Sequence, residues 1–349
     1  MGMIKLPEQS VDYFKRNIDE IFISGNLAEG PWTEKLAKEV KEISGTKYAI
    51  PTVSNGSGIV ALLQIYKQYY NRRKVMIQSN TMYGVKTMVA SGGCELVGYI
   101  DCRIESLMPS IKDVENAINS YKGKLSELIL LLSDIGGIVN PDAVKIGAFC
   151  KLNDIVFIED CAHSFGASLN GKSAGTFGDA GVYSFYATKA IFAGEGGVVV
   201  TDNEEIGNYL KGFTIYDRFD QKMPIGVNIR PSEIQALLIY SVVKEFEEII
   251  NNKTKIAEKY IEVCKIFNIQ FIDQSQDNLK GNYYKFLILS PDIPIRKLYP
   301  RIQTTTSPVY DYSIGVYNPI ANHHLCLPIW YDQGIEITLK VCEEINKQL

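Results

Sequence analysis

Residues 155–160 read Ile155-Val156-Phe157-Ile158-Glu159-Asp160, an apolar run that ends in two carboxylates. Such a run predicts a strand that is buried on both faces, as in the parallel sheets of α/β proteins. Ligands of these folds bind beyond the carboxyl ends of the strands, which is where Asp160 falls. Asp160 is therefore a candidate ligand-binding residue, although a carboxylate at this position can also cap a helix or pair with an arginine.

The surrounding sequence repeats this pattern between about residues 45 and 205. Short apolar runs alternate with longer amphipathic ones, which predicts a mostly parallel, mixed sheet with helices on both faces. The expected strands are 47–53, 75–78, 95–99, 128–132, 155–160 and 182–185, and the expected helices are 59–70, 85–91, 114–121 and 144–152.

The character of the sequence changes after Asn228. One long helical stretch from Ser232 to about Tyr260 is followed by mixed segments that include a strand-like run at 283–289. We expect an α/β chain of two domains: a large domain with the N-terminal segment, residues 1–242, and a smaller C-terminal α/β domain, residues 243–349.

Composition excludes several classes of partner. The 349 residues carry a formal charge of −4 without a Lys/Arg cluster, so neither nucleic acid nor an anionic membrane is expected as a partner. No stretch approaches the ~20 apolar residues of a membrane span. Seven cysteines without a CxxC pair favour reduced thiols in a soluble, cytoplasmic protein. The pair His323-His324, with Cys326 as the nearest further ligand type, does not predict a metal site.

Lys189 carries the most chemical information. It ends the segment Ser184-Phe185-Tyr186-Ala187-Thr188-Lys189 and precedes the cluster Gly194-Glu195-Gly196-Gly197. A lysine, a strand-end aspartate and a set of small residues able to surround a phosphate are what an enzyme needs to hold pyridoxal 5′-phosphate. The lysine would form a Schiff base with the aldehyde, and Asp160 would keep the pyridine nitrogen protonated.

The turn Ser54-Asn55-Gly56-Ser57-Gly58 follows one expected strand and opens a helix. Backbone N–H groups at the positive end of a helix suit a phosphate dianion. Taken alone, such a turn is more often just a turn, and a single lysine is more often solvated. It is their combination with Asp160 that indicates a cofactor site.

The chain resembles the DegT/DnrJ/EryC1/StrS family of sugar aminotransferases, which have the aspartate aminotransferase fold (fold type I). The similarity runs nearly from end to end in the order of the family's motifs, and it is loose over the C-terminal hundred residues. The matching segments are 25–31, Asn55-Gly56-Ser57-Gly58, 81–93, Asp160-Cys161-Ala162-His163, 175–179, 184–201 and Gly226-Val227-Asn228-Ile229-Arg230.

This resemblance implies a role for each matching residue. Lys189, Asp160 and His163 would be catalytic, with His163 at the cofactor's phenolic oxygen or over its ring. Asn228 would reach the cofactor of a neighbouring subunit, which implies a homodimer with shared active sites. The implied cofactor-binding residues are Gly56, Ser57, Gly58, Met82, Asp160, His163, Ser184, Lys189 and Asn228, with Ser57, Gly58 and Ser184 at the phosphate.

Met82 is a departure from the family pattern. The family usually has an aromatic residue straight after the threonine at position 81, stacked on the pyridine ring. Here Met82 occupies that position and Tyr83 follows. Methionine can pack on a ring through its polarizable sulfur, and Tyr83 or His163 are the alternatives. Tyr216, Arg218 and Tyr310 are further aromatic or basic positions expected near the rim of the site.

The resemblance implies a pyridoxal phosphate-dependent transaminase of amino-sugar and polysaccharide biosynthesis. It would transfer an amino group, with L-glutamate as the expected donor, to a keto sugar carried on a nucleotide. The alternatives are a non-catalytic or regulatory pyridoxal phosphate-binding protein of the same fold and a pyridoxal phosphate-dependent sugar dehydratase. Relatives of the dehydratase kind replace the lysine with histidine, which Lys189 argues against.

Overall fold

The computed structural model describes residues 5–348, except 217, 219–221, 277 and 299–318. Its centre is a seven-stranded sheet in which the four strands β5, β4, β2 and β3 are joined in parallel and β8 is parallel to β5. β9 runs antiparallel to both of its neighbours. The order across the sheet is β1 (Tyr48–Thr52), β9 (Gly197–Thr201), β8 (Ala180–Ser184), β5 (Val156–Cys161), β4 (Leu128–Ser133), β2 (Lys74–Gln78) and β3 (Glu95–Ile100). The predicted mostly parallel, mixed sheet is confirmed.

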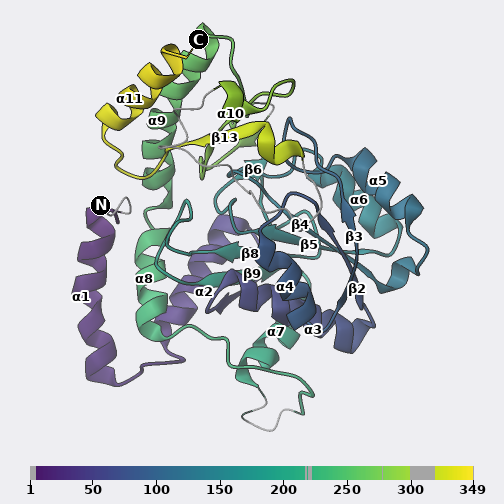
Figure 1. Cartoon of the computed structure of the whole chain (residues 1–349). Helices are drawn as coiled ribbons and strands as arrows, with labels where there is room; N and C mark the ends of the chain where they lie inside the picture. Colours follow the sequence, from purple (N-terminus) through teal and green to yellow (C-terminus); the bar gives the residue numbers. More distant parts are fainter. Residues whose placement is uncertain (1–4, 217, 219–221, 277, 299–318, 349) are drawn as a thin grey trace.

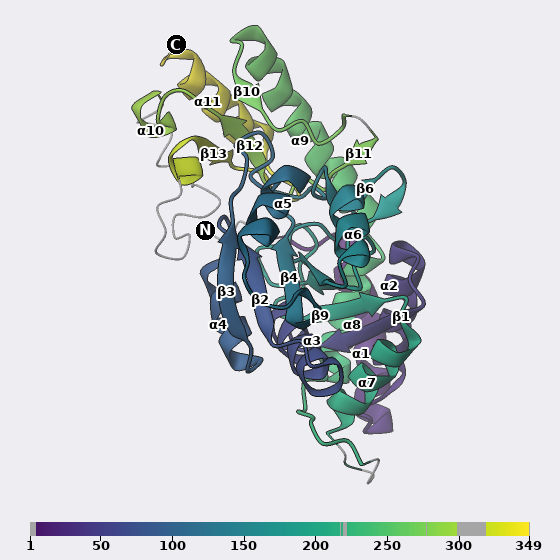
Figure 2. The ribbon, with the colours of Figure 1, turned by 90° about the vertical axis from the view of Figure 1, so that its right-hand side faces the viewer.

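Helices cover both faces of this sheet (Figures 1 and 2). One face packs against α3 (Asn55–Tyr70), α4 (Tyr83–Ser91) and α7 (Glu204–Ile215). The other packs against α2 (Pro31–Ser44), α5 (Ile111–Ser120), α6 (Ala143–Leu152) and α8 (Glu233–Val243), and α1 (Glu8–Ser24) lies along α8. Residues alternate between these two cores along each strand, so Ile158 lies on the α3 face and Phe157 on the α6 face.

The C-terminal part forms a separate hydrophobic cluster around a small antiparallel sheet. This sheet is drawn at the top of Figures 1 and 2, beside α9 and α11. Its strands are β10 (Gln270–Phe271), β12 (Phe286–Leu289) and β13 (His324–Leu327), and its helices are α9 (Phe246–Ile266), α10 (Ile295–Leu298) and α11 (Ile335–Asn346). A third, short sheet connects β11 (Leu279–Lys280) to β6 (Ser168–Leu169) and β7 (Lys172–Ser173), and two 3-10 turns lie at Leu125–Glu127 and Pro319–Asn322. 

The expected single helix from Ser232 to about Tyr260 is wrong: the stretch is two helices. Ser232 caps α8, accepting a hydrogen bond from the N–H of Gln235 at 3.2 Å, and the helix ends at Val243. Its Tyr240 packs on Trp32 of α2, whereas Tyr260 of α9 packs on Phe286 of the small sheet. α8 ends one residue beyond the predicted domain boundary at 242, but Phe246 and Ile249 at the start of α9 still pack in the core of the large sheet. The packing partner therefore changes farther along α9, not at the break. The division into two domains stays a prediction.

Two further expectations concern the environment of the protein. Over the described residues, none of the helices combines the length and the apolar character that crossing a membrane requires. All seven cysteines lie in that part of the chain and are free thiols.

Candidate active site

Asp160 lies at the carboxyl end of β5 with its side chain on the α3 face of the sheet. It is buried, and three groups donate hydrogen bonds to it: Asn55 Nδ2 at 3.0 Å, Ser133 Oγ at 3.0 Å and the N–H of Ala162 at 3.2 Å. Burial raises the pKa of the carboxyl, and the charge of Lys189 is the largest of the opposing influences. The site therefore holds a desolvated carboxylate that a nearby cation stabilises.

Ser133 and Asn55 connect Asp160 to its neighbours. Ser133 Oγ lies 2.8 Å from Thr81 Oγ1, and Asn55 Nδ2 also donates to the carbonyl of Val182 at 2.8 Å. The carboxylate is thereby held by residues from the ends of β4 and β2 and from the start of α3. Residues of this kind are suitable for fixing the orientation of a catalytic group.

Lys189 is half-buried on the loop that follows β8. Its backbone N–H donates to the carbonyl of Tyr186 at 2.9 Å, and Gly194 and Gly196 have the positive φ angles of 86° and 147° that return the chain to β9. The ammonium lies 5.2 Å from the centroid of the Tyr284 ring, and its charge influences both Asp160 and His163. The structure thus brings the predicted lysine, aspartate and histidine together.

The turn at residues 54–58 is the N-terminus of α3, as expected. Ser54 and Ser57 form a reciprocal cap, in which the N–H of Ser57 donates to Ser54 Oγ at 3.1 Å and the N–H of Ser54 donates to Ser57 Oγ at 3.2 Å. The first helical N–H groups, those of Asn55 and Gly56, have no acceptor within a helix. They are the groups of this turn best placed to receive an anion.

Gly58 serves close packing. A Cβ there would lie 2.8 Å from Val199 and 2.9 Å from Val182, and its N–H donates to the carbonyl of Ser54 at 3.3 Å. Ser184 is buried at the end of β8, where its hydroxyl accepts a hydrogen bond from the N–H of Tyr186 at 3.4 Å. The phosphate contacts assigned to Gly56, Ser57, Gly58 and Ser184 stay predictions.

His163 is buried between the large sheet and the C-terminal part. Its ring lies 4.2 Å from that of Tyr284, centroid to centroid, and its Nδ1 accepts a hydrogen bond from the N–H of Gly136 at 3.4 Å. Burial, followed by the charges of Lys189 and Lys285, lowers the pKa of His163 well below its usual range. Both influences favour the neutral form of the imidazole.

Met82 precedes α4 and is 39% exposed. Its sulfur accepts a hydrogen bond from the N–H of Gly84 at 2.9 Å, and Tyr83 beside it is 53% exposed. Both side chains are accessible to a ligand or a second subunit. The expectation that Met82 or Tyr83 packs on the cofactor ring stays a prediction.

Asn228 lies on an exposed segment before α8, and its Oδ1 accepts a hydrogen bond from the N–H of Arg230 at 3.4 Å. Arg230 Nε lies 2.9 Å from a carboxylate oxygen of Glu29, which also pairs with Arg218. The two distant motifs at 25–31 and 226–230 thus meet in space. Arg230 lies 5.4 Å from the Tyr216 ring, whereas Tyr310 is outside the described residues.

The residues present fit pyridoxal phosphate. Asp160 is a buried carboxylate whose raised pKa reflects the lack of solvent, so a pyridinium beside it would supply a counter-charge. Lys189 is close enough to interact electrostatically with Asp160, and the N-terminus of α3 is reached through Asn55, whose side chain contacts that carboxylate directly. These elements would hold the ring nitrogen, the aldehyde and the phosphate, respectively.

A second group of buried acids lies behind Asp160. Asp134, Glu159 and Cys161 have ligand atoms within 4.8 Å of one another. The Glu159 carboxylate already accepts hydrogen bonds from the N–H groups of Gly175, Phe177 and Gly178, so these contacts explain its burial without an ion.

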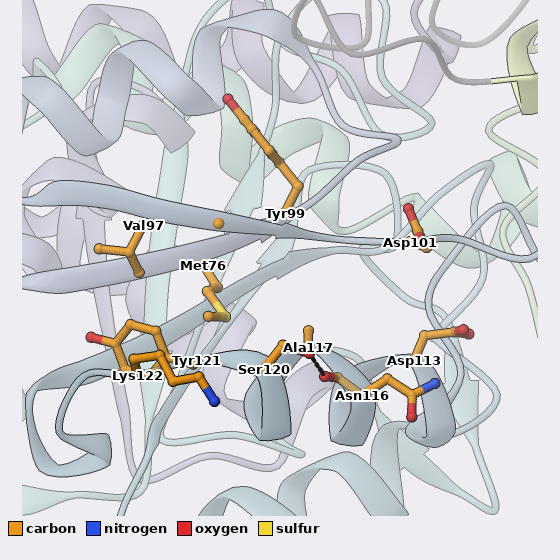
Figure 3. Close-up of a pocket in the computed structure, with 11 residues that line it drawn as sticks. Met76, Val97, Tyr99, Asp101, Asp113, Asn116, Ala117, Ser120, Tyr121 and Lys122 are labelled. Atoms are coloured by element: carbon orange, nitrogen blue, oxygen red, sulfur yellow. Dashed lines mark hydrogen bonds between the residues drawn. The ribbon is translucent and has the colours of Figure 1, made fainter.

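A cavity of about 520 Å³ lies elsewhere, between α5 and the neighbouring strands β2 and β3 (Figure 3). Its lining includes Met76 and Val97 from the strands and Ala117 from α5. Since α5 covers the face opposite α3, this cavity is not part of the Asp160 site.

Several residues of the site were not predicted from the sequence. Ser133 ends a predicted strand as Asp160 does, so its position was a usable signal. Tyr284 and Lys285 lay within an expected strand, where nothing in the local pattern indicated a site. Asn282, whose side chain donates to the carbonyls of His163 and Phe165 at 2.7 Å and 3.0 Å, gave no signal either.

Comparison with known proteins agrees with the motif-based resemblance. The model of the DegT/DnrJ/EryC1/StrS aminotransferase family matches residues 9–305. The chain is 26% identical over 306 residues to the GDP-perosamine synthase of Vibrio cholerae, covering 84% of this chain and 80% of that one. It is 25% identical over 325 residues to the GDP-4-keto-6-deoxy-D-mannose 3-dehydratase of Yersinia pseudotuberculosis, with 84% and 80% covered.

A solved DegT DnrJ EryC1 StrS aminotransferase from Brucella abortus has a similar fold. Its TM-score is 0.87 at 20% identity, and 99% of each chain is covered. The predicted fold type is confirmed by this similarity.

Proposed function

The chain belongs to the DegT/DnrJ/EryC1/StrS aminotransferase family, and we propose that it transfers an amino group from L-glutamate to a keto sugar carried on a nucleotide, with pyridoxal phosphate as cofactor. The observation that carries this proposal is the convergence of Lys189, buried Asp160 and the N-terminus of α3 at one edge of the sheet.

Each residue then has a defined task. When bound, pyridoxal phosphate supplies an aldehyde that condenses with amines and a ring that withdraws electrons from the donor's Cα. Asp160 keeps a proton on the pyridine nitrogen, and Asn55 and Ser133 hold the carboxylate in place. Lys189 Nζ accepts the proton from the donor's Cα and returns it as a general acid. Neutral His163 packs beside this centre without adding a positive charge.

The relatives suggest the class of acceptor. The names of two of them refer to GDP-linked sugars, which supports a nucleotide sugar as the acceptor of this chain. The dehydratase relative keeps that alternative open, but Lys189 favours the aminotransferase, since the resemblance places histidine there in dehydratases. The amino group then enters amino-sugar and polysaccharide biosynthesis.

A homodimer with shared active sites is part of the proposal. Large apolar side chains next to the site residues are exposed: Tyr186 lies three residues before Lys189, and Val227 precedes Asn228. Met82 is exposed as well, and a second copy of the chain would cover exposed apolar side chains of this kind. A cytoplasmic location is consistent with seven free thiols.

The experiment that tests the function uses the purified protein loaded with pyridoxal phosphate. L-Glutamate should bleach the cofactor's absorbance and yield 2-oxoglutarate, and a panel of keto sugar nucleotides should then be aminated, as followed by mass spectrometry. Borohydride reduction should attach the cofactor to Lys189. If no amino donor bleaches the absorbance, the chain is a non-catalytic binding protein and the proposal is wrong.

A further inference from the structure

Lys253 is a buried lysine outside the family motifs. It lies on α9 and is 3% exposed. One turn earlier, Ile250 and Phe246 pack on the loop after β5, where a Cβ at Gly166 would lie 3.1 Å from each. Residues three positions apart share a helix face, so Lys253 also faces the junction between the C-terminal part and the large sheet.

Lys253 has no anionic partner among the described residues. Lysines this deeply buried are normally paired, yet neither an ion pair nor a hydrogen bond of its ammonium exists in residues 5–348 outside the undescribed gaps. Burial, with a smaller contribution from the charge of Lys285, lowers the pKa of Lys253 to about 7. The one charge that influences this pKa is thus another cation, which makes the burial of Lys253 costly without a bound anion.

Lys285 places this cation pair next to the reaction centre. Its ammonium lies 4.9 Å from the centroid of the Tyr284 ring, and Lys189 Nζ lies 5.2 Å from the same centroid. Lys285 Nζ and Lys189 Nζ are therefore no farther apart than the sum of their distances to this centroid. The Lys285 charge also lowers the pKa of both His163 and Lys253. Lys285 therefore lies within reach of the active-site histidine and of α9.

We propose that Lys253 and Lys285 form a carboxylate-binding subsite for the amino donor. This inference rests on the proposed function, in which the donor's amine reacts at the position of Lys189. A carboxylate of the same molecule would then meet two cations that have no counter-ion in the part of the chain that the structure describes, and charge-assisted hydrogen bonds to it are stronger than neutral ones.

Burial favours the donor over the nucleotide as the source of the anion. A residue that is 3% exposed leaves room for a small acid at most, whereas the diphosphate of a nucleotide sugar carries a base and two sugars that need an open surface. The C-terminal part would thereby bind the donor, while the exposed side of the site near Tyr186 remains available for the larger substrate.

The test measures binding without catalysis. Glutarate, a dicarboxylate that has no amine to react, should raise the Tm of the pyridoxal phosphate-loaded wild type. It should not do so for Lys253→Met or Lys285→Gln, and Lys253→Arg should restore the shift. The exposed Lys255 of the same helix supplies the matched control, because Lys255→Met should respond like the wild type. Inorganic pyrophosphate, the probe for phosphate, should shift all five proteins equally.

Kinetics provide the second readout. The KM for L-glutamate should rise at least tenfold in Lys253→Met, with the KM for the keto sugar nucleotide unchanged. An unaltered glutarate shift in Lys253→Met overturns the subsite. The subsite is also overturned if Lys253→Met or Lys285→Gln loses the Tm shift with pyrophosphate or raises the KM for the keto sugar nucleotide. The bound anion would then be a phosphate. Should the wild type bind glutarate but never transaminate, the proposed function fails while the subsite stands.

Discussion

Replacing Asp160 with asparagine separates the charge of this residue from its hydrogen bonds. The remaining amide oxygen can accept from Asn55 Nδ2 and from the N–H of Ala162, as Oδ1 does now. The new NH₂ group takes the place of Oδ2 and can donate to Ser133 Oγ, whose hydroxyl then donates to Thr81 Oγ1, 2.8 Å away. The network therefore survives, and we expect the stability of the fold to change by less than about 1 kcal/mol.

Loss of the charge should be much more costly for catalysis. Two unit charges about 4 Å apart attract by roughly 4 kcal/mol at an effective dielectric constant of about 20. If that attraction holds the proton on the pyridine nitrogen, its loss slows the reaction about 10³-fold. The assay is single-turnover bleaching of the bound cofactor by L-glutamate, with the Tm recorded for each protein.

A matched variant distinguishes charge from hydrogen bonding. Ser133→Ala removes one donor to the carboxylate but keeps the charge, so a loss of about tenfold is expected from one charge-assisted hydrogen bond. Turnover by Asp160→Asn within tenfold of wild type, at an unchanged Tm, would refute the assignment of this carboxylate to the cofactor ring.

Three further outcomes are expected. Lys189→Ala should abolish turnover while cofactor remains bound, as judged by absorbance and single-turnover kinetics; retained transamination would remove the lysine from its role. Glu233→Ala should lower the free energy of unfolding by about 3 kcal/mol in a urea titration. The reason is that the buried Glu233 carboxylate accepts hydrogen bonds from the N–H groups of Trp32 and Thr33 at 2.7 Å and 3.1 Å. A change below about 1 kcal/mol would contradict this. Between pH 7 and 9 the wild type should gain stability relative to Lys253→Met. The folded protein releases the Lys253 proton near pH 7, whereas an unfolded lysine retains its proton to about pH 10. Parallel curves of stability against pH for the two proteins would be evidence against a depressed pKa of Lys253.

The sheet was largely predictable because its strands are local apolar runs. Residues 155–160 differ from the observed β5 by one position at each end, and 128–132 from β4 by a single residue. Antiparallel β9 was not predicted, because it follows a turn that contains Gly194 and Gly196 and its partner β1 is far away in sequence. A local pattern contains no information about such a partner.

The residues of the site also fall into those that the local sequence indicates and those that it does not. Asp160 and Lys189 could be identified because a strand end and a glycine-rich return are visible in the sequence. Tyr284 and Lys285 could not, since they contribute only after the C-terminal part packs on His163. The break between α8 and α9 was missed for a related reason: it falls on Lys244 and Glu245, which are good helix formers, so the interruption is set by tertiary packing and not by the local sequence.

β1 lies at the edge of the large sheet and is bonded there to β9 alone. On the ribosome, Thr52 is synthesised 145 residues before Gly197, an interval of about 10–30 s at typical elongation rates. During that time the apolar faces of α1 and α2, which include Trp32 and Leu36, have not yet met α8. The nascent chain must therefore keep its first fifty residues soluble until the last strand of the sheet emerges, a period in which a chaperone would have its longest opportunity to bind.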